Sequence, residues 1–456
     1  MNGTYYSEIT PDILKMARQS EKISFIDPKL YLDLDVKRGL RDLDGKGVRA
    51  GLTDISIVNG RKTGPDGKDI PMEGELYYRG YSINDLVNGF YREGRYGFEE
   101  IAYLLIMGEL PNEKSLQLFS DALSRSREQL PNHFVRDIIM NAPSPDMMNV
   151  LARSVLTLYS FDDQADDISI PNVLRQCIQL IAMLPLISVY GYHIYQHYYN
   201  GKSLHINQPD PSLSYAENLL HVLRKNGKFT QTEARLLDIA LVLHMEHGGG
   251  NNSSFTTHVV SSSGTDTYSV FAASLGSLKG PRHGGANRKV VQMMDDLKEK
   301  VKDWNDEDEI RAYLLSLLTK DGFDHSGLIY GMGHAVYSLS DPRAVLLKQF
   351  AKQLSEEKGL TKEYNLYTLV EKLAPQVISK RVKIYKGVSA NVDFYSGYVY
   401  DILSLPMELY TPLFAIARSV GWTAHRIEEL SNRGKIIRPA YVSISEKHKY
   451  KPIMRR

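Results

Sequence analysis

Four short segments combine histidine or aspartate with glycine, and their residue types and spacing could do chemistry. The segments are HGGGN at 247–251, PRHGGAN at 281–287, GMGH at 331–334 and NVDFYSG at 391–397. Glycine beside histidine allows the backbone to approach a ligand closely. A histidine can polarise a carbonyl group, and an aspartate can remove a proton. Taken singly, each histidine is better explained as a satisfied turn residue.

Three arginines near these segments point to an anionic ligand. Arg343 lies in the sequence DPR, Arg418 in a predicted helix and Arg438 in the sequence IRP. Guanidinium groups bind carboxylates through two parallel hydrogen bonds. Several arginines and histidines with one carboxylate therefore suit a small substrate that carries several negative charges. For any one arginine alone, a surface ion pair is the simpler explanation.

A metal site is an alternative use of the same residues. His244 and His247 are three residues apart on one predicted helix, and His283 or Asp393 could complete a coordination shell. The two-histidine helical motif of zinc proteases is absent, however. We therefore expect no metal ion, and no other cofactor.

The predicted helix before the first segment has a clear start and stop. Thr230 and Glu233 form a capping-box pattern, and apolar residues follow at spacings of three and four. A run of glycines from Gly248 ends the pattern. We expect this helix to deliver His247 at its C-terminus, beside a flexible loop.

A second helix is predicted from Thr411-Pro412 to about Leu430. Proline is favoured at the first position of a helix, and the residues at 418, 421, 422 and 425 fall on one helical face. The other expected elements are a helix that opens at Thr10-Pro11, helices over 98–107, 113–129, 147–159 and 214–224, and a small hairpin between 55 and 78.

Length and composition describe an ordinary globular protein. The chain has 456 residues, with 55 Lys plus Arg against 54 Asp plus Glu, so its formal net charge is +1. That balance argues against a nucleic-acid-binding protein. With 43% apolar and 24% charged residues, the chain can bury a sizeable core, which excludes disordered and fibrous classes.

The same sequence predicts a soluble, cytoplasmic protein. Cys177 is the only cysteine, so no intrachain disulfide is possible and a reducing compartment is expected. The N-terminus has neither a basic nor an apolar signal region. Residues 176–201 contain no charged side chain, but their polar residues and Pro185 favour a buried, kinked helix over a membrane span.

Taken in order, the segments resemble those of the citrate synthase family along nearly the whole chain. The resemblance begins at KRGL (37–40) and EGELYYRG (73–80) and continues through the four segments above. It ends with FAIARSVGWTAHRIEE (414–429) and IRP (437–439). It implies a mainly α, two-domain fold with a small N-terminal β element.

The resemblance also implies a division of the chain and a motion. A large domain over 1–283 returns at 401–456, and a small domain lies between them at 284–400. Closure of the small domain over oxaloacetate would build the site for acetyl-CoA and exclude water. We therefore expect oxaloacetate to bind first.

Three residues would carry the reaction that the resemblance implies, in which acetyl-CoA condenses with oxaloacetate and the citryl-CoA thioester is hydrolysed. Asp393 would take a proton from the acetyl methyl group. His283 would donate a hydrogen bond to the thioester oxygen. His334 would polarise the ketone of oxaloacetate and protonate the new alkoxide. Citrate formation would place the enzyme in the tricarboxylic acid cycle.

Other positions match family residues that bind the substrates. His247, Arg343 and Arg418 would bind the carboxylates of oxaloacetate. Arg438 matches an arginine that family members supply from the neighbouring subunit, which implies a homodimer or a higher homo-oligomer.

The CoA side of the resemblance is less complete. Lys383 and Lys386 lie where family lysines approach the CoA phosphates. Family members often carry a basic residue four positions after the GMGH histidine, where this chain has Ser338. Gly248 stands where glutamate is common. These departures concern the affinity for CoA and its contacts, not the proposed base.

Two rival functions share the same residues. A 2-methylcitrate synthase performs the same chemistry on propionyl-CoA, and one methylene is worth about 1–3 kcal/mol in an apolar pocket. The second rival is a non-catalytic paralogue that binds carboxylates. For a citrate synthase and for a 2-methylcitrate synthase alike, we expect small-molecule substrates, a homo-oligomer, and no nucleic-acid or membrane partner.

Overall fold

The structure is a computed structural model that describes residues 7–42, 46–381, 387–432 and 434–455. The chain divides into two units. The larger unit is Gly51–Ile437, and the smaller unit combines Met1–Ala50 with Arg438–Arg456. Arg438 therefore belongs to the smaller unit, together with the N-terminal helices.

The fold is mainly α, as predicted, with 59% of the structure helical. The smaller unit holds α1 (Pro11–Ser24), α2 (Lys29–Asp33) and 3-10 turns at Arg38–Leu40 and Ile453–Arg455. The α-helices of the larger unit are α3 (Ile83–Arg92), α4 (Phe98–Met107), α5 (Glu113–Arg127), α6 (Met147–Leu158), α7 (Ile170–Asn200), α8 (Tyr215–Leu223), α9 (Gln231–His244), α10 (Asn252–Ser261), α11 (Thr267–Lys279), α12 (Ala286–Lys300), α13 (Glu307–Leu318), α14 (Pro342–Glu357), α15 (Thr361–Arg381), α16 (Val392–Ile402) and α17 (Tyr410–Ser431). Short helical turns of other kinds lie at Val135–Ile139, Tyr159–Phe161 and Met407–Leu409.

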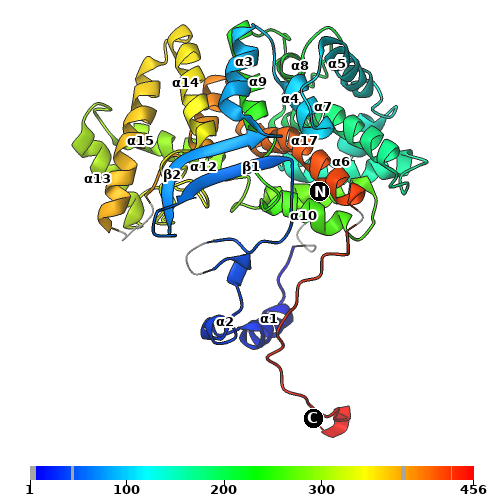
Figure 1. Ribbon diagram of the computed structural model, residues 1–456, viewed down its shortest axis with the longest axis vertical. Coiled ribbons are helices and arrows are strands. Elements are labelled where there is room, and N and C mark those ends of the chain that lie inside the picture. The colour runs from blue at the N-terminus through cyan, green and yellow to red at the C-terminus, as the bar shows by residue number, and fades with distance from the viewer. Residues whose placement is uncertain (1–6, 43–45, 382–386, 433, 456) are drawn as a thin grey trace. The chain divides into compact units, whose positions relative to one another are not determined.

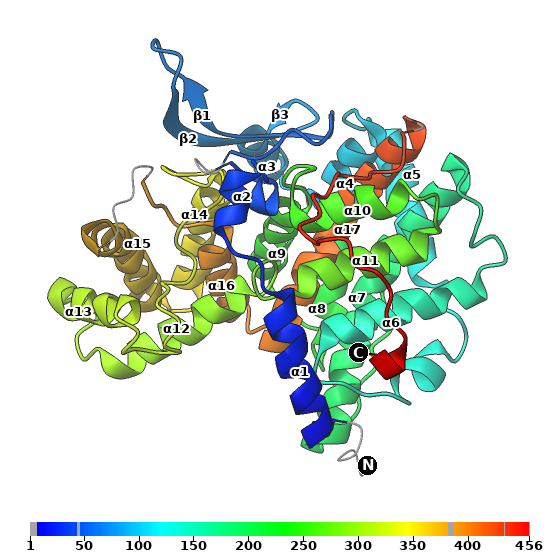
Figure 2. The same ribbon diagram turned by 90° about the horizontal axis from the view of Figure 1, so that it is seen from below.

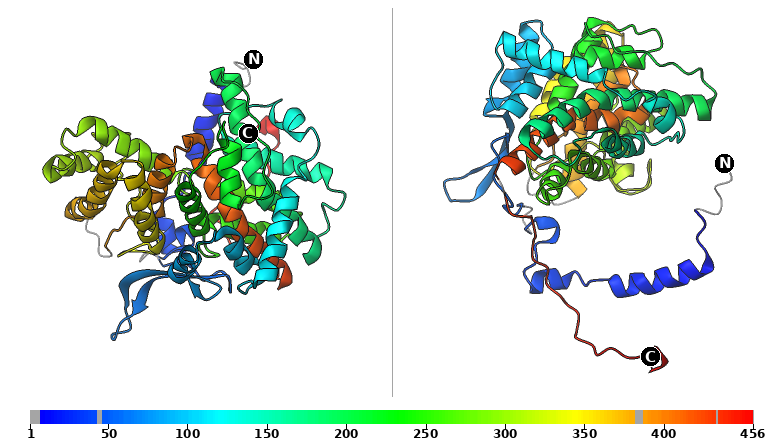
Figure 3. Two further views of the ribbon diagram at one scale, coloured as in Figure 1. Left: turned by 90° about the horizontal axis from the view of Figure 1, so that it is seen from above. Right: turned by 90° about the vertical axis from the view of Figure 1, so that its right-hand side faces the viewer.

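The expected hairpin is confirmed and forms the main part of a small antiparallel sheet. Strands β1 (Ser56–Thr63), β2 (Asp69–Tyr78) and β3 (Tyr81–Ser82) pair in that order. The register of β1 and β2 shifts between Asn59 and Arg61. In Figures 2 and 3 the turn between β1 and β2 projects away from the helices.

Helices α7 and α17 form the centre of the larger unit. Helix α17 contacts α4, α7, α9, α10 and α11, and Figures 1 and 2 show it among the other helices, with α13 and α15 on one side and α5 and α6 on the other. Helix α7 is long and apolar enough to cross a membrane by length and composition, but 78% of its most apolar window is buried in the structure. It is a core helix, and it contains Pro185 as predicted.

Local capping signals were reliable guides to several helices. The Thr10 side chain caps α1, and Thr230 and Glu233 form the predicted capping box of α9. Helix α9 ends at His244, however, so the prediction that His247 lies at the helix C-terminus is wrong. His247 lies in the loop that follows.

The predicted start of α17 is also wrong in detail. The helix begins at Tyr410, and Thr411 lies inside its first turn instead of capping it. The Thr411 hydroxyl group donates to the Gly284 carbonyl oxygen at 3.2 Å. A contact between distant parts of the chain thus replaces the local cap.

Candidate active site

The end of α9 and the middle of α17 approach closely, and this contact places the first functional side chains. A Cβ atom on Gly421 would lie 2.4 Å from the Met245 carbonyl oxygen and 2.6 Å from Glu246 Oε2. Any larger residue at 421 would therefore separate the two segments. Arg418 Nε donates to the His244 carbonyl oxygen at 2.8 Å, which fixes the guanidinium group beneath the His244–His247 segment.

Arg418 is a buried cation with unused hydrogen-bonding capacity. Its side chain is fully buried, and neither Nη1 nor Nη2 has a hydrogen-bond partner among the described residues. Burial lowers the pKa of Arg418 to about 10, while Glu246 opposes this shift. The group stays cationic at neutral pH. Two unpaired N–H edges on a buried guanidinium match the two oxygens of a carboxylate.

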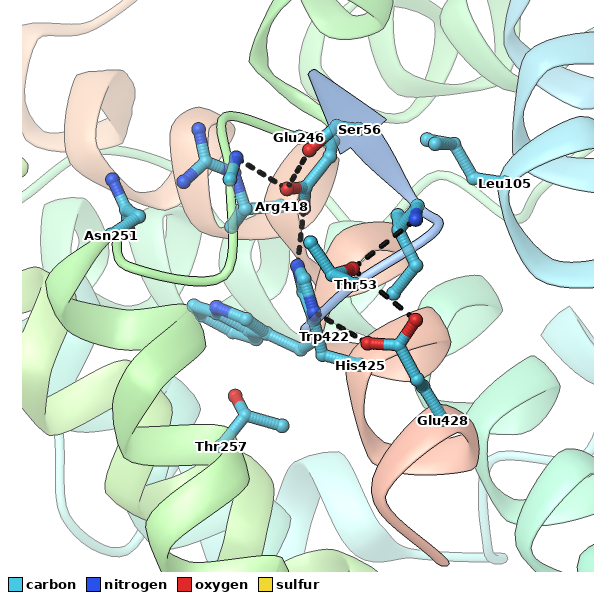
Figure 4. Close-up of polar contacts among 12 residues, drawn as sticks. Thr53, Ser56, Leu105, Glu246, Asn251, Thr257, Arg418, Trp422, His425 and Glu428 are labelled. Carbon is cyan, nitrogen blue, oxygen red and sulfur yellow. Dashed lines mark hydrogen bonds and ion pairs between the residues drawn. The ribbon is translucent and has the colours of Figure 1, made fainter. Parts of the chain in front are cut away.

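Glu246 ties this region to the sheet. Its Oε1 accepts from Ser56 Oγ at 2.9 Å and from the Gly248 backbone N–H at 2.5 Å. Its Oε2 lies 3.0 Å from His425 Nε2, and Figure 4 shows the two side chains pointing toward each other. Burial alone raises the pKa of Glu246, but His425 and Arg418 hold it at about 2. A charged Glu246 therefore positions the glycine loop after His247.

The hairpin holds the His334 loop against His247. Gly60 and Gly74 have no room for a Cβ atom, since it would lie 2.6 Å from the Val336 carbonyl oxygen and 2.3 Å from the Ser340 carbonyl oxygen, respectively. The Tyr337 hydroxyl donates to the Glu75 carbonyl oxygen at 3.3 Å and lies 3.1 Å from His247 Nε2.

The ring of His334 is oriented by its own loop. Its Nδ1 accepts from the backbone N–H groups of Val336 at 3.1 Å and Tyr337 at 3.2 Å. A neutral His334 therefore carries its proton on Nε2. The ring stacks on Tyr337 with a centroid distance of 4.8 Å and lies 5.1 Å from the ring of His247. Burial, followed by the charge of Arg343, lowers the pKa of His247 well below its usual value.

Asp393 lies at the N-terminus of α16, next to the His334 loop. The Asn391 side chain caps α16 by accepting the Asp393 N–H at 3.0 Å and donates to the Gly333 carbonyl oxygen at 2.8 Å. Asp393 Oδ1 is buried and finds no hydrogen-bond partner in the described ranges. Burial raises the pKa of Asp393 to about 6, and Arg343 opposes that rise. The Asp393 carboxylate therefore binds a proton more readily than a solvated aspartate does.

His283 lies beside Phe414. Its Nε2 accepts from the Ser253 backbone N–H at 3.4 Å and lies 3.1 Å from Ser253 Oγ. With Nε2 as the acceptor of the backbone N–H, a neutral His283 carries its proton on Nδ1. Burial, together with the charge of Arg418, lowers the pKa of His283 to about 4. The rings of His283 and Phe414 are 6.1 Å apart, and the Arg418 guanidinium lies 4.8 Å from the Phe414 ring centre.

Arg343 lies in the same site but is engaged with a neighbouring carboxylate. Its Nε and Nη2 donate to the two oxygens of Asp341 at 3.0 and 2.7 Å. Asp341 also accepts the Val392 N–H at 3.1 Å, so this ion pair joins α14 to the start of α16. A role in substrate binding requires Arg343 to share its donors between Asp341 and the substrate.

The structure thus brings six predicted residues into one linked site and leaves three unplaced. The linked residues are His247, His283, His334, Arg343, Asp393 and Arg418. Lys383 and Lys386 lie outside the described residues. Arg438 belongs to the smaller unit, whereas the six linked residues all belong to the larger one.

Three supporting residues were missed from the sequence. Glu246 stands between the two histidines of HMEH, Tyr337 follows the GMGH segment and Asp341 precedes Pro342. Their position within the matched segments was the only available signal, because their contacts are with distant parts of the chain. The alternative metal site is not formed in the described part of the chain: His244 and His247 do not meet His283 or Asp393 at the spacing of a metal site.

The raised pKa of Asp393 predicts a pH-dependent gain in stability for Asp393→Asn. Its pKa of about 6 in the folded chain exceeds the ordinary 3.8, so the folded state favours the protonated form. The stability that protonated Asp393 contributes to the folded state is full below pH 3.8 and is lost as the pH rises through 6. At pH 8 we expect Asp393→Asn to raise the free energy of unfolding by up to about 3 kcal/mol. Denaturant unfolding at pH 8 and pH 4 checks this, and an equal difference at both pH values would contradict it.

Comparison with known proteins shows the family to which the chain belongs. The family model for "Citrate synthase, C-terminal domain" matches residues 42–440. The citrate synthase of Synechocystis is 33% identical over 407 residues, which are 88% of this chain and 92% of that protein. A 2-methylcitrate synthase of Shewanella oneidensis is 30% identical and covers 89% of this chain and 96% of its own length.

Solved structures show the same fold. The citrate synthase of Thermotoga maritima superposes with a TM-score of 0.69 at 31% identity, covering 90% of this chain and 98% of its own. The citrate synthase of Thermoplasma acidophilum, solved as a ternary complex with carboxymethyl coenzyme A and oxaloacetate, has a TM-score of 0.73 at 28% identity and covers 91% and 98%. The chain belongs to the citrate synthase family. It is an enzyme of the citrate or 2-methylcitrate synthase type.

Proposed function

We propose that the protein condenses acetyl-CoA with oxaloacetate and hydrolyses the product to citrate and CoA. The observation that carries this proposal is a pair of buried groups in one site that have no hydrogen-bond partner among the described residues. They are the two terminal guanidinium nitrogens of Arg418 and one carboxylate oxygen of Asp393, and the pKa of Asp393 is raised. A dianionic 2-oxo acid would bind to the guanidinium nitrogens of Arg418, and a weakly acidic methyl group would give its proton to Asp393.

The chemistry of the proposed reaction follows from the protonation states in the site. Asp393 removes a proton from the methyl group of the thioester while His283 Nδ1–H donates a hydrogen bond to the thioester oxygen, which stabilises the negative charge of the enolate that forms. The enolate carbon then forms a bond with the ketone carbon of oxaloacetate, and the thioester carbonyl is restored. His334 Nε2–H stabilises the ketone oxygen as it becomes an alkoxide and gives it the proton. Water finally cleaves the thioester and releases CoA.

Burial explains why a carboxylate can act as this base. A thioester methyl group is a very weak acid, so the base and the enolate must be matched in a site from which water is excluded. The desolvated Asp393 is a stronger base than a solvated aspartate. All the acid and base groups in this scheme are side chains, and we propose that the reaction needs no metal or other cofactor.

The products identify which thioester the enzyme prefers. Oxaloacetate with acetyl-CoA is expected to give citrate and free CoA, which NMR of the reaction mixture detects. Propionyl-CoA in place of acetyl-CoA would give 2-methylcitrate, and a higher kcat/KM with propionyl-CoA would move the assignment to that activity. The relatives include enzymes of both names. Binding of oxaloacetate without any turnover of either thioester would favour a non-catalytic protein.

We further propose that Arg438 completes the oxaloacetate site of a neighbouring subunit in a homodimer. Arg438 is exposed in its own chain and lies outside the unit that holds the other site residues. A third guanidinium suits a substrate with two carboxylates. Lys383 and Lys386 are proposed to contact the phosphates of CoA.

A mixing experiment tests whether Arg438 acts across subunits. Arg438→Ala and Asp393→Asn are each expected to be nearly inactive as pure proteins at low oxaloacetate. A hybrid dimer would contain one intact site, made of Asp393 from one chain and Arg438 from the other, so random co-assembly should restore about a quarter of the wild-type activity. Failure of the co-assembled proteins to gain activity, with hybrid formation confirmed by two affinity tags, would contradict a shared site.

A further inference from the structure

Two histidines and a glutamate converge where α10 meets α17, behind the proposed active site. One donor atom from each of His258, His425 and Glu428 lies within 4.8 Å of the others. His258 Nε2 is 3.0 Å from His425 Nδ1, and His425 Nδ1 is 4.0 Å from Glu428 Oε2. Figure 4 shows His425 and Glu428 facing each other on α17. The proposed reaction uses none of these three side chains.

The outer atoms of these side chains are already held by other groups. His425 Nε2 lies 3.0 Å from Glu246, and His258 Nδ1 lies 2.8 Å from Glu429. Glu428 Oε1 accepts from Thr53 Oγ1 at 3.2 Å and from the Asp54 N–H at 3.0 Å. Metal-binding histidines commonly donate their second N–H to a carboxylate, which orients the ring and sets its tautomer. Both histidines here have that arrangement.

Without a cation between them, the inner atoms are poorly satisfied. The contacts Glu246–His425, His425–His258 and His258–Glu429 need three ring protons, but two neutral imidazoles carry only two. Glu428 Oε2 is buried without a hydrogen-bond partner among the described residues.

We propose that His258 Nε2, His425 Nδ1 and Glu428 Oε2 bind a divalent transition-metal ion such as Zn²⁺. A metal ion replaces the shared proton and gives Glu428 Oε2 a partner. Ligand atoms in a tetrahedral zinc site are about 3.3 Å apart, as metal–ligand bonds of about 2.0–2.1 Å require. His425 Nδ1 lies 3.0 Å from His258 Nε2 and 4.0 Å from Glu428 Oε2, and all three atoms lie within 4.8 Å of one another. The Glu428 carboxylate would therefore move towards the two rings when the ion binds. The proposal departs from the expectation, based on sequence, that no metal is bound.

The charge and accessibility of the cluster suit a cation that enters from solvent. Three carboxylates, from Glu246, Glu428 and Glu429, surround the two rings. The His258 side chain is 13% exposed and the Glu428 side chain 15% exposed, while His425 is fully buried. A water molecule would take the fourth position. Through His425 and Glu246, the bound ion would stiffen the wall of the oxaloacetate site without touching the substrate.

Metal binding by the full-length protein tests this site directly. Chelator-treated protein is titrated with Zn²⁺ against a chromophoric chelator, and each variant is compared with wild type. We expect one tightly bound Zn²⁺ per chain and at least a 100-fold weaker affinity in His258→Gln and in Glu428→Gln. His448→Gln removes an exposed histidine from the C-terminal segment and should leave the affinity unchanged. Cys177 cannot supply the site, because it is fully buried.

The variants also separate metal binding from folding. Glu428→Gln keeps the oxygen that accepts from Thr53, so it should fold and retain circular dichroism like that of wild type. Zn²⁺ should raise the melting temperature of wild type and His448→Gln but not of the two ligand variants. The proposal is overturned if wild type binds no stoichiometric Zn²⁺, or if both folded ligand variants bind it as tightly as wild type. Neither result depends on which thioester the enzyme uses.

Discussion

Asp393→Asn is expected to lower the rate of citrate formation by about 10²- to 10⁴-fold, the usual contribution of a general base, and to leave oxaloacetate affinity within a few-fold of wild type. The amide keeps the size of the side chain and its place at the start of α16 but cannot accept the methyl proton. Steady-state kinetics give the rate, and calorimetry gives the affinity. Asp401→Asn, an exposed aspartate on the same helix, is the matched control and should retain full activity.

The same residue sets the acid limb of the pH profile. Because Asp393 must be ionised to act, kcat/KM of the wild type should fall tenfold per pH unit below about pH 6. Asp393→Asn should lose that limb in whatever activity remains. A variant that keeps more than a tenth of the wild-type turnover would rule out Asp393 as the base.

Arg418→Gln is expected to weaken oxaloacetate binding by about 10²- to 10³-fold. Removal of one partner of a buried, hydrogen-bonded charge pair costs about 2–5 kcal/mol. Both terminal nitrogens of Arg418 lack a hydrogen-bond partner within the described part of the chain. Glutamine fills part of the space but cannot form the bidentate contact. Calorimetric titration with oxaloacetate measures the change.

The control for Arg418 lies on the same helix. Arg426 is equally buried, but its nitrogens are taken by Ser261, Thr265 and Thr267. Arg426→Gln should lower stability and leave oxaloacetate affinity nearly unchanged. If the two variants lost the same affinity, the effect of Arg418 would be a general loss of structure and not the loss of a substrate contact.

Local signals in the sequence predicted most of the elements that surround the site. The helix over 98–107 and the hairpin between 55 and 78 are found where expected, because periodicity and turn residues act within a few residues. The end of α9 was placed too late. Glycines from 248 onward stop a helix, but the chain leaves the helix at His244, where the His244 carbonyl oxygen accepts from Arg418.

The site itself was predicted as a set of residues but not as a set of contacts. The matched segments named His247, His283, His334 and Asp393. The structure joins them through the loop after α9, the His334 loop, the start of α16 and, for His283, Phe414 of α17. No sequence pattern could show that Arg343 is paired with Asp341 or that Glu246 reaches His425, because these depend on how distant segments pack. The separations of the His258 cluster are invisible in the sequence for the same reason.

The most direct test of the proposed reaction is the release of free CoA thiol from acetyl-CoA, followed with a thiol reagent. Wild type and Asp401→Asn are predicted to release thiol rapidly and only when oxaloacetate is present, and Asp393→Asn is predicted to release almost none. A blank without oxaloacetate corrects for background hydrolysis of the thioester and for reaction of the Cys177 thiol with the reagent. Thiol release that does not need oxaloacetate, or that survives Asp393→Asn, would contradict a condensation in which Asp393 is the base.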